Sequence, residues 1–192
     1  EDIRVCDPAV ELLEWARREF GIRRTFEAQE AGLESMPDSV FICTPTALHV
    51  EQALRSIRAG AHVFAEKPLS TSAEGVAELE AAARDLGRTV MVGHCFRFHE
   101  GLRKAKEWLD EGRIGRLISV RAVMGEYIPD VMPNYRSMYI SKYNGAYELM
   151  HDIDLALWYA GQPPVSVFGV DGTFGDSGME SPDLAEMIIR FE

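Results

Sequence analysis

An acid, an amine and a proline follow one another at Glu66, Lys67 and Pro68. They come directly after the short apolar run at 61–64, which predicts a buried strand of a parallel sheet. In open α/β sheets, ligands bind beyond the carboxyl ends of the strands, and Glu66 and Lys67 are expected at such an end. Pro68 favours an extended backbone at Lys67, which would aim the amine towards a ligand. The segment therefore predicts a binding or catalytic lysine, and an exposed lysine in a surface loop is the alternative.

A second candidate is His151, on a helix that we expect over residues 148–160. Asp154 shares one face of this helix with the histidine, and Glu148 lies one turn before it, close enough to orient the ring by a hydrogen bond. A histidine that a carboxylate orients can carry a proton near neutral pH, whereas the alternative is a purely structural histidine. A metal site is not predicted, because no second histidine or cysteine stands at ligand spacing.

Further candidates follow the other predicted strands of the first half of the chain. Asp7 comes after the strand at 3–6, where a dinucleotide-binding fold places a ribose-binding carboxylate. It can also cap the next helix, and the two roles are compatible. The residues after the strand at 39–43 are Thr44, Pro45, Thr46 and His49. Their small hydroxyl groups and proline would let a ligand approach closely, and the alternative is a helix N-cap with His49 exposed.

Arg97 follows the apolar strand at 89–92, so it is also expected near the carboxyl edge of the sheet. Its guanidinium could bind a sugar hydroxyl or an anionic group of a substrate. It could equally tie the two halves of the chain together. Arg97 is therefore a candidate substrate contact with a structural alternative.

The elements that would position these residues change in kind along the chain. In the first half, apolar strands alternate with helices expected at 10–20, 47–59 and 73–86, which is typical of a parallel sheet covered on both faces. The elements expected after about residue 93 are a helix at 102–111, a strand at 117–123, the helix at 148–160 and strands at 165–172 and 184–191. This second pattern predicts an α+β domain with an antiparallel sheet.

Composition limits the classes of function. A chain of 192 residues with 46% hydrophobic content can bury a core as one or two domains, and no stretch is long and apolar enough to cross a membrane. The formal net charge of −11 argues against nucleic acid or an anionic membrane surface as a partner. Cys6 and Cys43 lie in apolar strand-like runs, and no C-x-x-C spacing occurs. Buried, reduced thiols in a cytoplasmic protein are therefore expected.

The order of these motifs resembles the glucose–fructose oxidoreductase / inositol dehydrogenase (Gfo/Idh/MocA) family. The segments that carry the resemblance are 7–8, 44–49, 60–69, 97–98, 112–115 and 151–154, so it covers nearly the whole chain. It implies a Rossmann-type α/β domain over residues 1–96 and an α+β domain with a mostly antiparallel open sheet over residues 97–192. Family members mostly oxidise or reduce a secondary alcohol or ketone of a sugar, a cyclic polyol or a related compound. The open sheet usually supports a homo-oligomer, here expected to be a dimer or tetramer.

The resemblance also implies roles for single residues. Lys67 would contact substrate and cofactor, and His151 would donate or accept the proton. Asp7 would bind the adenosine ribose of NAD rather than NADP, because no arginine or serine follows it, and the Lys67–Pro68 bond would be cis. The resulting sets are Asp7, Thr44, Pro45, Thr46, His49, Glu66 and Lys67 for the cofactor, and Arg97, Glu148 and Asp154 for the substrate.

The chain departs from the family pattern in two places. Many members carry an aspartate four residues before the histidine, where Tyr147 stands here with Glu148 after it. The glycine-rich fingerprint expected about 20 residues before Asp7 is missing, so we expect the first strand and phosphate loop to be absent and both domains to be truncated. The alternatives to a dehydrogenase are a non-catalytic sugar or dinucleotide sensor, an NAD-dependent glycosidase or epimerase, and an inactive half of a split protein.

Overall fold

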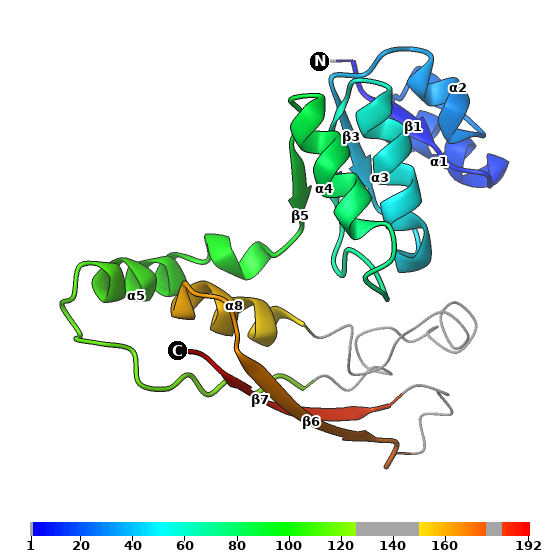
Figure 1. Cartoon of the computed structure of the whole chain (residues 1–192). Coiled ribbons are helices and arrows are strands. Elements are labelled where there is room, and N and C mark those ends of the chain that lie inside the picture. The colour runs from blue at the N-terminus through cyan, green and yellow to red at the C-terminus, as the bar shows by residue number, and fades with distance from the viewer. Residues whose placement is uncertain (1, 126–149, 176–181) are drawn as a thin grey trace. The chain divides into compact units, whose positions relative to one another are not determined.

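The computed structural model describes residues 2–125, 150–175 and 182–192. The chain forms two compact units, Glu1–Gly93 and His94–Glu192 (Figure 1), and the predicted domain boundary after residue 96 lies slightly later. The first unit is a parallel α/β unit and the second contains antiparallel strands, as the sequence predicted. No helix in the described part of the chain is long and apolar enough to cross a membrane.

The first unit alternates strands and helices. Its strands are β1 (Arg4–Cys6), β2 (Arg24–Phe26), β3 (Ser39–Ile42), β4 (His62–Ala65) and β5 (Val90–Val92). Its helices are α1 (Val10–Phe20), α2 (Gln29–Leu33), the 3₁₀ turn η1 (Thr46–Leu48), α3 (His49–Arg58) and α4 (Val76–Asp85). Sequence patterning missed β2 and α2, because three and five residues are too few to show a hydrophobic period.

The strands of the first unit pair in parallel as two sheets, β1–β2 and β3–β4–β5. In the register of the larger sheet, Ile42 lies opposite Ala65, and Ala65 lies opposite Val92. The carboxyl ends of the three strands are therefore level. The segments that follow them leave the sheet at one common edge.

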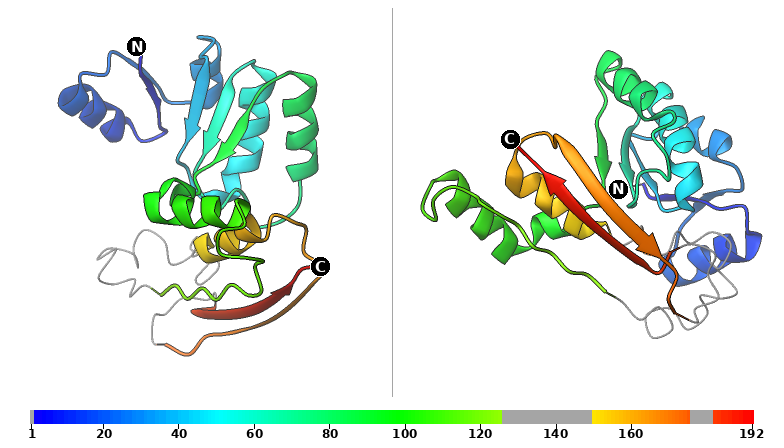
Figure 2. Two further views of the ribbon diagram at one scale, coloured as in Figure 1. Left: turned by 90° about the vertical axis from the view of Figure 1, so that its left-hand side faces the viewer. Right: turned by 60° about the horizontal axis from the view of Figure 1, so that its bottom comes forward.

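Among the described residues, β1 pairs only with β2, and β3 pairs only with β4. In the doubly wound strand order 3-2-1-4-5-6, the strand that leads into the glycine-rich loop lies between these two edges. The second view of the chain (Figure 2) shows β1 set apart from β3. That the first domain is truncated at this strand stays a prediction.

The prediction of buried cysteines is wrong. Cys6, Cys43 and Cys95 are all exposed and none forms a disulfide bond. Cys6 ends β1 and Cys43 follows β3, and each of these strands has one edge without a strand partner in the described chain. Phe41 on β3 is likewise 72% exposed, so an apolar run alone did not guarantee burial.

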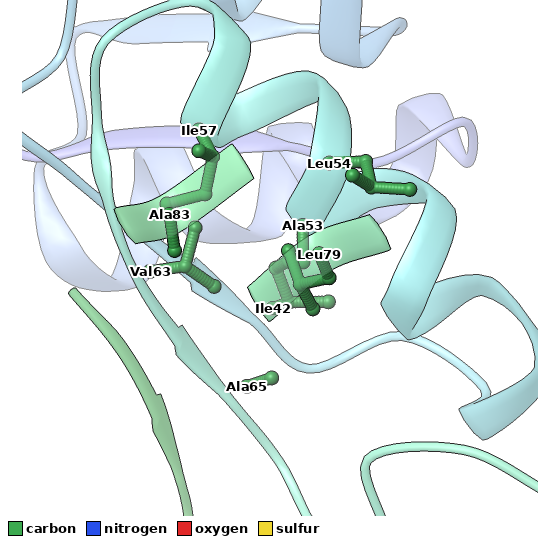
Figure 3. Packing of buried hydrophobic residues seen from close by; sticks show 8 residues of the cluster. All are labelled: Ile42, Ala53, Leu54, Ile57, Val63, Ala65, Leu79 and Ala83. Atoms are coloured by element: carbon green, nitrogen blue, oxygen red, sulfur yellow. The ribbon is translucent and has the colours of Figure 1, made fainter. Parts of the chain in front are cut away.

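The main core lies between the β3–β4–β5 sheet and the pair of helices α3 and α4 (Figure 3). Ala53 and Ile57, one turn apart on α3, are completely buried, and Val63 and Ala65 of β4 lie beneath them. Alanine at these contacts lets the helix approach the strand closely. This packing fixes the start of α3 relative to the end of β4.

Replacing Ile57 with alanine is expected to lower the free energy of unfolding of the chain by about 2–5 kcal/mol, because it opens a cavity at a side chain with no exposed surface. Ile3 lies in the same unit and is 62% exposed, so Ile3→Ala is the matched control. This variant should change the free energy of unfolding by about 0.5 kcal/mol or less. Urea denaturation followed by circular dichroism measures both. Equal losses for the two variants would contradict the placement of the core.

The second unit contains η2 (Cys95–Phe98), α5 (Glu100–Asp110), α8 (His151–Ala160), β6 (Ser166–Gly172) and β7 (Leu184–Arg190). β6 and β7 form an antiparallel pair in which Phe168 lies opposite Ile188. The strand predicted at 117–123 does not form, because a strand requires a ladder partner and β6 and β7 pair only with each other among the described residues. Ile118 in this segment is 91% exposed.

Candidate active site

Lys67 stands at the carboxyl edge of the β3–β4–β5 sheet, directly after β4. The backbone N–H of Glu66 donates to the carbonyl of Ile42 (2.9 Å), which extends the ladder between β4 and β3 by one bond. The Glu66 carboxylate accepts from the backbone N–H of Lys67 (3.2 Å). The peptide bond between Lys67 and Pro68 is cis, which confirms the prediction for this bond. The backbone of Lys67 therefore leaves the sheet in a defined direction.

His49 is 1% exposed and is the first residue of α3. Its Nδ1 lies 2.9 Å from the carbonyl oxygen of Pro68, and its Nε2 lies 2.7 Å from that of Thr44. The alternative of an exposed first-turn histidine is wrong. Since both ring nitrogens face backbone carbonyls, the ring joins the segments after β3 and β4, and a direct contact with a cofactor stays a prediction.

The remaining candidates after β3 lie beside this junction. The Thr44 hydroxyl donates to Oε1 of Gln52 on α3 (2.6 Å). Pro45 is exposed and Thr46 is half-buried at the start of η1. The structure thus gathers Thr44, His49, Glu66 and Lys67 at one sheet edge, and their contacts with a cofactor stay predictions.

Asp7 follows β1, in the other sheet of the first unit. Its Oδ1 accepts from the backbone N–H of Ala9 (2.8 Å), and Ala9 rather than Asp7 is the N-cap residue of α1. Contrary to the prediction, Asp7 therefore does not cap α1; its carboxylate instead stabilises the turn that precedes the helix. Oδ2 of Asp7 makes no hydrogen bond within the described residues, which leaves one carboxylate oxygen for a ribose hydroxyl.

The described residues fit part of a nicotinamide dinucleotide. A carboxylate oxygen of Asp7 suits a ribose hydroxyl. A Cβ on Gly93 would lie 3.3 Å from Oε2 of Glu66, so the glycine leaves room for the Glu66 side chain after β4. The pyrophosphate has no comparable cradle, since the sequence contains no G-x-G-x-x-G run. Binding of the ribose at Asp7 and of the nicotinamide at the edge beyond β4 and β5 stays a prediction.

In the second unit, His151 begins α8 and contacts the segment around η2. The ring of Phe96 stacks on the ring of His151 with centroids 4.6 Å apart at an angle of 24°. The ring of His94 meets that of His151 edge to face at 6.2 Å. These contacts set the plane of the His151 ring. Glu148, predicted as its orienting partner, lies outside the described residues.

Arg97 and Asp154 bind each other across 57 residues of sequence. Nε of Arg97 donates to Oδ2 of Asp154 (2.8 Å) and Nη2 donates to Oδ1 (2.7 Å). Asp154 is 7% exposed, and Nε2 of His94 lies 3.7 Å from its Oδ1. The hydrogen bonds from Arg97 to Asp154 raise the pKa of the guanidinium, which keeps it charged. The pair joins η2 to α8 one turn after His151, and contacts of either residue with substrate stay predictions.

Replacing Asp154 with alanine is expected to lower the free energy of unfolding by about 1.5–3 kcal/mol, because it removes the charged acceptor of Arg97 from a buried position. The matched control is Asp110→Ala, whose exposed carboxylate pairs with Lys106 one turn away on α5. Exposed pairs of this kind contribute about 0.3–0.5 kcal/mol. Urea denaturation followed by tryptophan fluorescence compares the two, and equal effects would contradict the role of the buried pair.

Sequence reasoning missed His94 and Phe96 as neighbours of His151. Their only signal was their place beside Arg97 after an apolar strand.

Cys43 follows β3, beside the candidate residues at the sheet edge. Partial burial and, to a smaller extent, the Glu66 carboxylate raise the pKa of its thiol, which opposes a reactive thiolate. Among the described residues, no group of three or more histidine, cysteine, aspartate or glutamate side chains could hold a metal ion.

Comparison with known proteins matches each half of the chain to a family model. Residues 2–94 match the model of an oxidoreductase family with an NAD-binding Rossmann fold, and residues 102–192 match the GFO/IDH/MocA C-terminal domain. The solved structure of the WlbA dehydrogenase from Bordetella pertussis, in complex with NADH and UDP-GlcNAcA, superposes with a TM-score of 0.84 at 25% identity. That match covers 98% of this chain and 57% of the other.

Two curated proteins illustrate the range of relatives. Inositol 2-dehydrogenase of Rhizobium meliloti is 34% identical over 162 residues, which is 81% of this chain and 47% of the relative. The 2,7-anhydro-N-acetylneuraminate hydratase of Escherichia coli is 28% identical over 158 residues, which is 80% of this chain and 42% of the relative. The chain thus spans less than half the length of these two relatives.

Proposed function

Since this chain belongs to the GFO/IDH/MocA family of oxidoreductases, we propose that its protein transfers hydride between NAD and a secondary alcohol or ketone of a sugar or cyclic polyol. The observation that carries the proposal is the placement of Lys67 at the carboxyl edge of the parallel sheet, with its backbone held on both sides. This edge is where open α/β sheets bind their ligands. The names of an inositol dehydrogenase and of a UDP-sugar-bound dehydrogenase among the similar proteins support the substrate class.

The proposed chemistry divides the work between an amine and an imidazole. Bound NAD would supply the acceptor for the hydride that leaves the carbinol carbon. Lys67 stabilises the negative charge that develops on the substrate oxygen. His151 takes the hydroxyl proton, with its ring held by Phe96. In the reductive direction the same groups return the proton to the oxygen.

Asp7 supports NAD over NADP, because a carboxylate accepts hydrogen bonds from ribose hydroxyls and repels a phosphate.

The exposed apolar side chains of the β6–β7 pair, Phe168 and Ile188 among them, support a homo-oligomer in which this sheet is covered. Light scattering of the full-length protein measures its mass and therefore its number of subunits.

Exposed free thiols fit a reducing compartment, and we propose that the protein is cytoplasmic.

The test is an assay of the full-length protein with NAD and a panel of inositols, sugars and nucleotide sugars. Substrate-dependent formation of NADH, followed by its absorbance, is the expected result. Saturable NAD binding without turnover of any compound in the panel would favour the sensor instead. Absence of both binding and turnover would contradict the proposal.

A second candidate is an enzyme that borrows hydride and returns it, such as an NAD-dependent glycosidase or epimerase. The similarity to a protein named a hydratase favours it, since hydration involves no net oxidation. Such an enzyme would convert its substrate without accumulating NADH. Product analysis by mass spectrometry alongside the absorbance assay separates the two candidates.

The 192-residue chain is expected to bind NADH about 10²- to 10⁴-fold more weakly than a longer protein that carries a phosphate loop. The physical reason is the missing phosphate loop, since two hydrogen bonds to a charged group contribute about 1.5–3 kcal/mol each. Energy transfer from Trp15, Trp108 and Trp158 to the nicotinamide reports binding in a titration. Equal affinity of the two proteins would show that the loop is dispensable and would contradict this expectation.

A further inference from the structure

The contacts of His49 carry an inference that deepens, and rests on, the proposed function. The side chain is 1% exposed, and apart from it only Ser56 and Asp154 are buried polar or charged residues in the described chain. Each ring nitrogen lies within hydrogen-bond distance of a carbonyl oxygen, of Pro68 and of Thr44. These carbonyls belong to the segments that follow β4 and β3. His49 thus joins the segment after β3 to the segment after β4. The ladder between the two strands ends at Glu66, so the sheet does not hold these segments together.

The two contacts need hydrogen-bond donors, because a carbonyl oxygen only accepts. A neutral imidazole donates from one nitrogen and a protonated one donates from both. An apolar side chain of similar size would fill the same space and leave both carbonyls without a donor. Packing alone therefore does not account for a histidine at this position.

Lys67 lies between two fixed points of the backbone. On one side, the N–H of Glu66 donates to the carbonyl of Ile42 at 2.9 Å. On the other side, the carbonyl of Pro68 meets Nδ1 of His49 at 2.9 Å. These two contacts restrain the backbone of Lys67 from both sides. Since misplacement of a reacting group by about 1 Å can cost about 10²-fold in rate, this restraint bears directly on turnover.

We propose that His49 is a positioning residue that fixes Lys67 by holding the carbonyls of Pro68 and Thr44. It acts through the backbone and not through contact with the substrate. Loss of the ring contacts loosens the Glu66–Pro68 segment and the segment at 44–46. The amine of Lys67 then samples positions from which it no longer stabilises the substrate oxygen.

The variants that test this role are His49→Leu and His49→Gln in the full-length protein. His49→Leu removes both ring contacts, whereas His49→Gln keeps an amide that can reach one carbonyl. Ser56→Ala is the matched control, because Ser56 is also buried on α3 and its hydroxyl donates to the backbone carbonyl of Gln52 (2.8 Å). A general weakening of α3 would affect the control as well.

Two readouts separate the positioning role from a structural one. Hydrogen exchange of peptides spanning residues 43–47 and 65–70 should quicken in His49→Leu and stay near wild type in Ser56→Ala. In the assay, His49→Leu should lower kcat by about 10- to 100-fold with a smaller change in KM, and His49→Gln should recover part of the loss. In a Lys67→Ala background, His49→Leu should lower kcat little further, because its effect passes through Lys67.

Each outcome is decisive. Unchanged exchange in both peptides would overturn the bridge, whatever the activity. Faster exchange with an undiminished effect of His49→Leu in the Lys67→Ala background would overturn the link to Lys67. If Lys67→Ala alone leaves turnover unchanged, the catalytic role of Lys67 in the proposed function fails and the positioning role fails with it, whereas the exchange data still report on the bridge.

Discussion

Replacing Lys67 with alanine in the full-length protein is expected to lower turnover by about 10²- to 10⁴-fold, the range for removing a positioned acid–base or electrostatic group. The reason is the negative charge that grows on the substrate oxygen as hydride leaves the neighbouring carbon. A positively charged amine at the carboxyl edge of β4 stabilises that negative charge. Alanine leaves the charge to water and to weaker dipoles.

Steady-state kinetics with NAD and the substrate found in the panel measure the effect. Lys104→Ala is the matched control, because that lysine is half-exposed and its contacts, an ion pair with Glu107 and a cation–π contact with the ring of Trp108, lie on α5. Its turnover should stay within about twofold of wild type. Wild-type turnover in Lys67→Ala would remove this amine from the mechanism.

Replacing His151 with alanine is expected to lower turnover by about 10²-fold or more at neutral pH and to change the shape of the pH profile. In the oxidative direction a neutral imidazole must take the proton, so wild-type turnover should fall as the pH is lowered and the ring becomes protonated. The variant lacks this group. Its turnover should therefore be low without that acid limb and should rise only as hydroxide begins to substitute for the base.

The measurement is the pH dependence of kcat and kcat/KM for both proteins. His99→Asn is a suitable control, because His99 is an exposed histidine whose ring accepts from the backbone N–H of Leu102 at the start of α5, a role that asparagine can keep. Its profile should match the wild type. An acid limb that persists unchanged in His151→Ala would assign the proton transfer to another group.

The sequence was sufficient where the pattern is local. The run at 61–64 predicted β4 because strands of a parallel sheet are buried on both faces and read as continuous apolar runs. The helix expected at 10–20 is α1, and Gly21 after it adopts the left-handed conformation that ends the helix. The motif order then placed Lys67, Glu66 and Thr44 at one sheet edge, where the structure has them.

The sequence was insufficient where a residue depends on a distant partner. Nothing near Arg97 indicates that its guanidinium binds Asp154, 57 residues away, because only packing of α8 on η2 brings them together. The same holds for His49, whose buried ring contacts the carbonyl of Pro68, a residue that is distant in the sequence. The segment at 117–123 has the alternation of a strand but no ladder partner among the described residues, so its pattern alone was misleading.

The most direct test of hydride transfer uses the full-length protein with NAD and substrates that carry deuterium on the carbinol carbon. Mass spectrometry of the nicotinamide after turnover shows where the label goes. We expect one deuterium on the nicotinamide ring, formed far more slowly by Lys67→Ala than by wild type. Saturable binding of NAD with no transfer of deuterium from any labelled inositol, sugar or nucleotide sugar would contradict the proposed activity.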